Sequence, residues 1–227
     1  MAPGRYPVFE PRLEILRPAQ RVLWPSLGGL SELDLVLYGG TAIALRLGHR
    51  FSEDFDFFTD RHLNKAAVQS VLPHAEYEVL QDVENTYTVL ITAPGQAGPV
   101  KLSCFGGLGF GRFGEPALAV GSGVAVASLD DLLATKLAAV MMWMESKDYR
   151  DIAALLRAGE SLPRGLAIAA KMHGAQFAVA QCLKTLTYFQ GGDLAELPAS
   201  DRAVLCGASA AVEDLPDVLR LSSALTG

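Results

Sequence analysis

The chain has 227 residues, enough for one large domain or two small lobes with a buried core. Its formal net charge of −6 argues against broad, sequence-independent binding of nucleic acid, because such binding needs a basic surface. Three cysteines without a Cys-x-x-Cys pair favour a reducing, cytoplasmic compartment. The N-terminus lacks an apolar signal segment, and charges interrupt the apolar run 129–144, so we expect no membrane association.

In chain order, the N-terminal half alternates helices with short strands. Apolar periodicity predicts a helix over residues 11–30. A strand over 33–38 precedes a Gly39-Gly40 turn, and Thr41 is a candidate N-cap for a following helix over 42–47. The remaining predicted elements are a strand over 55–58, a helix over 64–72, antiparallel strands over 76–80, 87–92 and 100–105, a glycine-rich loop over 106–114 and an extended piece over 120–127.

From Ser128 onward, helical patterns dominate the sequence. This change in pattern predicts a boundary between lobes at residues 127 and 128. The predicted helices cover 129–144, 147–158, 163–173 and 176–189, followed by a loop over 191–200 and a weaker helical tail.

Two aspartates stand out within the predicted strand around residue 55. Asp54 and Asp56 alternate with Phe55 and Phe57, so both carboxylates leave one face of the strand and both rings leave the other. Adjacent carboxylates repel each other unless a cation lies between them. The pattern therefore indicates a site for a divalent metal, whose oxygen ligands would be Asp54 and Asp56.

The Gly39-Gly40 turn precedes this aspartate pair. Glycines after a strand allow a phosphate to approach closely, and the start of the next helix adds free N–H groups. Either motif alone is more often structural, the glycines as a tight turn between a strand and a helix and the aspartates as surface acids. The order strand, Gly-Gly, helix, Asp-x-Asp, strand is far more specific, because each motif has its required structural context.

This order resembles the nucleotidyltransferase superfamily that includes DNA polymerase β. Within it, the segment YGGTAIALRLGHRFSEDFDFF, residues 38–58, is similar to the abortive-infection (AbiEii/AbiGii) toxin family of nucleotidyltransferase-like proteins. The resemblance covers residues 35–156 and includes a helical lysine, Lys136, and paired aspartates, Asp148 and Asp151.

The resemblance implies an α+β fold, with a nucleotidyltransferase-type mixed β-sheet and flanking helices over 1–127 and a helical lobe over 128–227 that contributes to the cleft. It implies Mg²⁺-dependent transfer of a nucleotide from an NTP to an acceptor hydroxyl. Some members are toxins that modify RNA and are paired with an antitoxin. An RNA acceptor, a cognate antitoxin and a role in phage defence are therefore further expectations.

The resemblance also implies site residues in both predicted lobes. Gly39, Gly40 and Thr41 would bind the β- and γ-phosphates. Lys136, with Arg46 or Arg50, would neutralise the triphosphate. The residues assigned to catalysis are Asp54, Asp56, Lys136, Asp148 and Asp151, and those assigned to nucleotide binding are Gly39, Gly40, Thr41, Arg46, Arg50 and Ser103.

Lys136 falls inside the apolar stripe of its predicted helix, where a lysine needs a partner or an anionic ligand. We favour the ligand, and the alternative is a structural salt bridge to Asp148. Asp148 also points inward, and both Asp148 and Asp151 can equally be structural acids near a helix start.

A third carboxylate, which catalytic members of the superfamily often carry, is missing from the predicted strand 100–105. Ser103 takes its place, and a hydroxyl is a poor base and a weak metal ligand. Either Asp148 or Asp151 supplies the missing charge, or the second metal comes with the nucleotide, or catalysis is weak or lost. Two other functions therefore stay open: a nucleotide-binding sensor with weak or no catalysis, and a protein-interaction module on the same fold. The sequence leaves the NTP and the acceptor undetermined.

Overall fold

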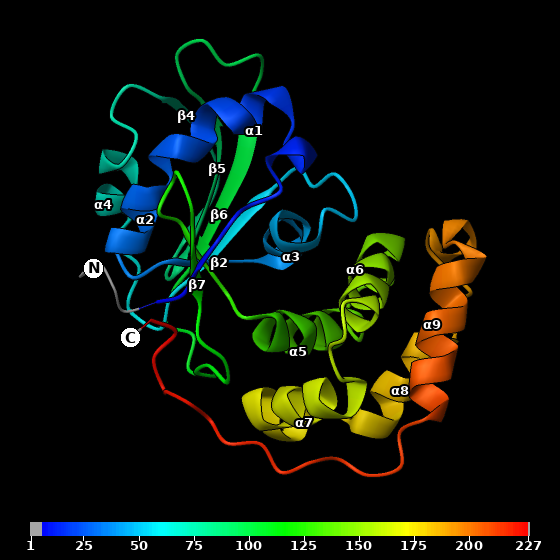
Figure 1. The fold of residues 1–227 in the computed structure, drawn as a ribbon. Coiled ribbons are helices and arrows are strands. Elements are labelled where there is room, and N and C mark those ends of the chain that lie inside the picture. The colour runs from blue at the N-terminus through cyan, green and yellow to red at the C-terminus, as the bar shows by residue number, and fades with distance from the viewer. Residues whose placement is uncertain (1–5, 227) are drawn as a thin grey trace. The chain divides into compact units, whose positions relative to one another are not determined.

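The computed structural model describes residues 6–226 and divides them into two compact units. The sheet unit comprises residues up to 128 together with those from 221 onward, and the helical unit comprises residues 129–220. Figure 1 shows the elements of both units. Among the described residues, no helix is long and apolar enough to cross a membrane.

A mixed β-sheet forms the centre of the sheet unit. Its eight strands in the described residues are β1 (Val8–Phe9), β2 (Val36–Tyr38), β3 (Phe55–Phe58), β4 (Glu76–Val83), β5 (Thr86–Thr92), β6 (Val100–Phe105), β7 (Ala117–Ala119) and β8 (Ala125–Val126).

The strand order is β1-β7-β8-β2-β3-β6-β5-β4. The pairs β1–β7, β2–β8 and β3–β6 are parallel, and the other four pairs are antiparallel. The predicted antiparallel arrangement of the three strands after residue 75 is confirmed, and β3 and β6 have the predicted bounds. This sheet, together with the helices, confirms the predicted α+β class.

The single helix predicted over residues 11–30 is wrong. Short helical pieces replace it, because Pro18 and Pro25 lack a backbone N–H and can sit only in the first turn of a helix. The pieces are a 3-10 turn (Leu13–Ile15), α1 (Pro18–Leu23), a 3-10 turn (Trp24–Ser26) and α2 (Gly28–Glu32).

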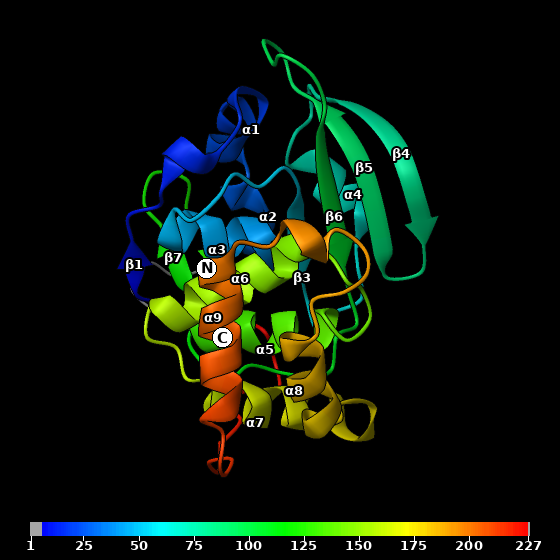
Figure 2. The same cartoon turned by 90° about the vertical axis from the view of Figure 1, so that its right-hand side faces the viewer.

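The two faces of the sheet are covered by different helices. α4 (Lys65–Ser70) and α3 (Gly39–Leu47) lie on opposite faces (Figures 1 and 2). The hydroxyl of Tyr77 in β4 donates to carbonyls at the end of α4, and the ring of Trp24 stacks on Phe55, 6.0 Å away. Phe55 and Phe57 are fully buried, as the alternation along β3 predicts, so the side chain of Asp56 leaves the opposite face.

Five α-helices form the helical unit in the described part of the chain. Gly165 lets two of them pack closely, because a Cβ there would lie 2.6 Å from the side chain of Leu133. The elements are α5 (Leu129–Ala139), α6 (Ser146–Arg157), α7 (Leu162–His173), a 3-10 turn (Gly174–Gln176), α8 (Val179–Thr187), a 3-10 turn (Leu194–Glu196) and α9 (Ala199–Ala210).

The helix predicted over 129–144 ends early, at Ala139. The next residues are apolar but do not form a buried helix face, since Met142, Trp143 and Met144 are all exposed. The prediction ran past the end of the helix because it followed the apolar composition of these residues, which do not continue the helical periodicity.

The helical unit ends at Arg220, whereas the predicted helical lobe runs to residue 227. Residues 221–226 belong to the sheet unit, where Arg112 holds them. The amide of Arg112 donates to the carbonyl of Ser222 at 2.9 Å, and its guanidinium donates to the carbonyl of Thr226 at 2.9 Å. The amide of Leu225 donates to the carboxylate of Asp60 at 3.0 Å. Contacts between segments this far apart in the chain leave no local pattern in the sequence.

Candidate functional site

Asp54 and Asp56 lie at the start of β3, on the face of the sheet that they share with residues of the neighbouring strand β6. In the parallel register of β3 and β6, Asp56 pairs with Ser103 and Phe55 pairs with Leu102. Asp54 immediately precedes β3, and its side chain is 41% exposed. The pair therefore stands at the start of a strand whose other face is fully buried, with carboxylate oxygens accessible to a ligand.

The glycine turn lies directly against this pair. Gly39 has a φ of 73°, a conformation that favours glycine, and a Cβ there would lie 2.6 Å from Oδ2 of Asp56. α3 begins at Gly39, and the side chain of its N-cap residue, Tyr38, makes no capping hydrogen bond. The first N–H groups of a nine-residue helix thus face the neighbourhood of Asp56, an arrangement suited to binding an anion.

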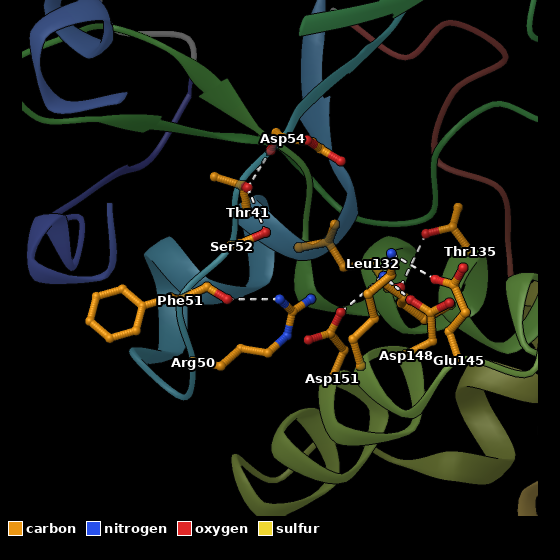
Figure 3. Close-up of polar contacts among 12 residues, drawn as sticks. Thr41, Arg50, Phe51, Ser52, Asp54, Leu132, Thr135, Glu145, Asp148 and Asp151 are labelled. Atoms are coloured by element: carbon orange, nitrogen blue, oxygen red, sulfur yellow. Dashed lines mark hydrogen bonds and ion pairs between the residues drawn. The ribbon is translucent and has the colours of Figure 1, made fainter. Parts of the chain in front are cut away.

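Thr41 does not have the predicted N-cap role, because α3 begins two residues earlier and Tyr38 is its N-cap residue. Thr41 is buried, and its hydroxyl donates to the carbonyl of Asp54 and lies 2.8 Å from Oγ of Ser52 (Figure 3). Thr41 therefore ties α3 to the segment that carries the aspartates. Sequence reasoning missed Ser52, which carries no motif of its own.

The two arginines predicted to bind nucleotide have different surroundings. A Cβ on Gly40 would collide with the guanidinium of Arg50, so this group lies against the turn. The same guanidinium donates to the carbonyl of Phe51 at 2.9 Å (Figure 3). Arg46 instead lies over the ring of Phe9, 4.2 Å from its centroid, and burial lowers the pKa of its guanidinium. Its contacts give Arg46 a packing role.

The predicted position of a third carboxylate holds a hydroxyl and, beside it, a lysine. Ser103 is 3% exposed and pairs with Asp56 in the sheet register. Two residues earlier on the same face of β6, Lys101 places its Nζ 3.4 Å from Oδ2 of Asp54. Sequence reasoning gave Lys101 no role, because its distance from Asp54 depends on how β3 and β6 pair.

The next residue of β6 provides no nucleophile. Burial, together with the nearby charge of Asp56, raises the pKa of the Cys104 thiol to about 12. Cys104 is therefore a neutral core residue at physiological pH.

In the helical unit, Lys136 of α5 is enclosed by two carboxylates of α6. Its Nζ lies 2.5 Å from Oδ1 of Asp148 and 2.9 Å from Oδ2 of Asp151, and all three side chains are buried. Burial alone lowers the pKa of Lys136, but the charges and hydrogen bonds of Asp151 and Asp148 outweigh it and raise the pKa above its ordinary value. The structural salt bridge weighed for Lys136 is therefore present, and Asp151 contributes a second ion pair.

The predicted site residues thus form two groups, one in each unit. The sheet unit brings together Gly39, Gly40, Arg50, Asp54, Asp56 and Ser103, with Lys101 and Ser52 added. The helical unit brings together Lys136, Asp148 and Asp151.

A family model described as "Nucleotidyl transferase AbiEii toxin, Type IV TA system" matches residues 29–216. The chain belongs to this AbiEii family. The match confirms the resemblance read from residues 38–58 and makes the chain a member of a nucleotidyltransferase family.

A curated relative and several solved structures are similar to parts of this AbiEii family chain. The protein aq_aa25 of Aquifex aeolicus (strain VF5) is 69% identical over 26 residues, a stretch covering 12% of this chain and 13% of the relative. This chain therefore matches only a small part of that relative's length.

The solved structures match over most of their length. MenT4, the nucleotidyltransferase toxin Rv2826c of Mycobacterium tuberculosis H37Rv, is 15% identical with a TM-score of 0.57, and the match covers 86% of this chain and 84% of MenT4. JHP933 of Helicobacter pylori is 19% identical with a TM-score of 0.55, covering 85% of this chain and 90% of JHP933. At these identities the similarity establishes the fold, a nucleotidyltransferase fold.

Proposed function

We propose that the chain transfers a nucleotide from an NTP to an acceptor hydroxyl with the help of Mg²⁺. The observation that carries the proposal is the closeness of the glycine turn and the carboxylate pair, measured by the 2.6 Å that would separate a Cβ on Gly39 from Oδ2 of Asp56. A phosphate bound at the turn would lie beside the oxygens best suited to hold its metal ion.

The residues at this site fit Mg²⁺ that arrives with a nucleotide. Carboxylate oxygens are hard ligands, and Mg²⁺ is commonly held by one or two carboxylates together with substrate phosphates and water. Within residues 6–226, no group of three or more His, Cys, Asp and Glu side chains could hold a metal ion. The nucleotide would therefore complete the ligand set of Asp54 and Asp56. When bound, the ion would stabilise the negative charge that develops on the transferring phosphoryl group.

The chain's own groups would bind and orient the triphosphate. The N–H groups at the start of α3 would donate hydrogen bonds to phosphate oxygens, with Gly39 and Gly40 leaving room for them. The guanidinium of Arg50, beside Gly40, would neutralise phosphate charge. Thr41 would act indirectly, by fixing the carbonyl of Asp54 against α3.

The roles of Lys136, Asp148 and Asp151 in catalysis stay predictions that rest on the family resemblance. Their contacts within the helical unit account for all three as a buried ion-paired cluster. Tests of these residues must therefore separate loss of activity from loss of stability.

A catalytically weak nucleotide sensor is the second candidate, and Ser103 favours it. The position beside Asp56 where a third carboxylate would activate the attacking hydroxyl carries a side chain with no basic group. Nucleotide binding without release of pyrophosphate would select this alternative.

The biological setting that we propose follows the family. The family description supports a toxin that is paired with an antitoxin. We propose an RNA acceptor and a role in phage defence. A cytoplasmic site of action fits the three free cysteines, Cys104, Cys182 and Cys206, since reducing conditions keep thiols unpaired.

Label transfer tests the proposal directly. The full chain is incubated with each α-labelled NTP, Mg²⁺ and total RNA, and transfer of label and release of pyrophosphate are measured. We expect transfer from at least one NTP. Asp56→Asn should abolish both nucleotide binding and transfer while the fold is retained by circular dichroism.

A matched control is Asp82→Asn, which removes an exposed carboxylate of β4 that is paired with Lys65. This variant should transfer label like the parent. If the parent bound no NTP, or if Asp56→Asn bound MgNTP as tightly as the parent, the proposed function would be wrong.

A further inference from the structure

Lys101 supplies a positive charge to the aspartate pair from within the fold. Its Nζ lies 3.4 Å from Oδ2 of Asp54, and both side chains are 41% exposed. An exposed ion pair of this kind contributes little to stability, because water solvates both charges well. Folding therefore gives a weak reason for a lysine at this position, and the ligand site gives a stronger one.

The sheet register explains how the lysine reaches the site. Ser103 pairs with Asp56, so Lys101, two residues earlier along the parallel strand, is level with Asp54. Side chains two residues apart leave the same face of a strand. The four side chains of Asp54, Asp56, Lys101 and Ser103 thus form one patch on adjacent strands.

The charge of this patch and its number of anionic ligands together limit how many metal ions it can hold. Two carboxylates and one ammonium give a formal charge of −1, and the hydroxyl of Ser103 adds no charge. In two-metal sites, two divalent ions lie about 3.5–4 Å apart and stabilise both the attacking and the leaving oxygen. Two such ions beside Asp54 would face the ammonium of Lys101, and the protein would offer only two carboxylates, in addition to the nucleotide's phosphates, as anionic ligands.

We propose that Lys101 takes the electrostatic role of a second divalent ion, so that the site holds one Mg²⁺ for each bound nucleotide. Asp56, next to Gly39 and Ser103, is the main metal ligand, and Lys101 neutralises Asp54 and the adjoining phosphate charge. Lys101 is therefore a positioning and charge-balancing residue. The inference rests on the proposed function, because it concerns the nucleotide site of the same sheet unit.

Counting bound Mn²⁺ tests the stoichiometry. The full chain is loaded with Mn²⁺, which replaces Mg²⁺ as a paramagnetic probe, and a non-hydrolysable NTP analogue, and the complex is isolated from free ligand. Metal analysis then gives the ratio of Mn²⁺ to nucleotide, and electron paramagnetic resonance detects coupling between ions about 4 Å apart. We expect one uncoupled Mn²⁺ per nucleotide.

Variants of Lys101 extend the test. Lys101→Asp replaces the ammonium with a third carboxylate and should admit a second, coupled Mn²⁺. Lys101→Arg should keep one ion and most of the turnover. Lys101→Met should keep one ion, since it adds no ligand, and should lower turnover by about 10²-fold, as for other groups that stabilise developing charge. The control Lys65→Met, which breaks a lysine–aspartate pair at Asp82, should match the parent in both readouts.

Two results would overturn the inference. The first is two coupled Mn²⁺ ions per nucleotide in the parent, a measurement that needs no variant to fold. The second is parental turnover in Lys101→Met. Either result would leave the proposed function standing, whereas failure of the parent to bind any nucleotide would refute the proposed function as well.

Discussion

Each unit of this protein contains a cluster of two aspartates and one lysine, but the two clusters differ in exposure and in geometry. In the sheet unit, Asp54 is 41% exposed and lies 3.4 Å from an equally exposed Lys101. In the helical unit, Lys136 is buried between two carboxylates, 2.5 and 2.9 Å away. In the first cluster, carboxylate oxygens stay accessible to a ligand. In the second cluster, the lysine and the two aspartates form ion pairs with one another.

The difference shows that residue type alone does not identify a ligand site. An exposed pair is well solvated and can exchange one partner for another at low cost. A buried pair has lost its water, so the free energy of each charge depends on its partner. The same two residue types are therefore expected to bind a ligand in one unit and to be required for folding in the other.

The largest effect should come from Lys136→Met. The substitution leaves Asp148 and Asp151 buried without their cation, so the free energy of unfolding should fall by about 3–5 kcal/mol. Adding Asp148→Asn and Asp151→Asn should recover much of this loss. Urea denaturation without ligand measures both. A stable Lys136→Met protein that had lost nucleotide binding would instead support the triphosphate role predicted from the sequence.

A smaller effect on stability, with a large effect on binding, should follow from Gly39→Ala. The positive φ of Gly39 makes alanine strained by about 1–3 kcal/mol, and its Cβ would displace the carboxylate of Asp56. We expect nucleotide affinity to fall by more than about tenfold.

Gly95→Ala is the matched control for this substitution. Gly95 has a similar φ of 78°, and a Cβ there would meet nothing within 4 Å. The control should lose comparable stability in thermal denaturation but keep full affinity for MgNTP. Equal affinity in both variants would mean that the turn serves only to reverse the chain.

The pH dependence of the unfolding free energy should distinguish the buried cluster of Lys136, Asp148 and Asp151 from the exposed ion pairs. Because the pKa of Lys136 is raised in the folded state above the ordinary 10.5, the cluster's contribution is fully present below that value. It is then lost as the pH rises through the folded pKa, at up to about 1.4 kcal/mol per pH unit. The measurement is the difference in unfolding free energy between the parent and the variant Lys136→Met/Asp148→Asn/Asp151→Asn. A difference that declined near neutral pH would contradict the assignment.

The smallest effect should come from Lys147→Met. Lys147 pairs with Glu145 at 2.6 Å, but the two side chains are 57% and 49% exposed. The free energy of unfolding should change by no more than about 1 kcal/mol. This variant is the control for Lys136→Met, and a large loss here would undermine the distinction between exposed and buried pairs.

The sequence by itself determined the strands β3 and β6, the α+β class and the family, because each depends on short-range patterns. Alternation along residues 54–57 placed Phe55 and Phe57 in the core and the two aspartates on the opposite face, and the order of turn and carboxylates carried the resemblance. Where prolines interrupted a periodic segment, as between residues 11 and 30, the pattern overestimated the helix.

Only the tertiary structure decided which partner each charged side chain has. Arg46 and Arg50 are four residues apart and looked equivalent in the sequence, yet one packs on Phe9 and the other lies against Gly40. Lys101 contacts Asp54 because β6 pairs with β3 in one particular register. Lys136 forms ion pairs with both Asp148 and Asp151 because α5 packs on α6. Such partners come from distant parts of the chain. Their distances are fixed by how the whole core packs, which no local pattern encodes.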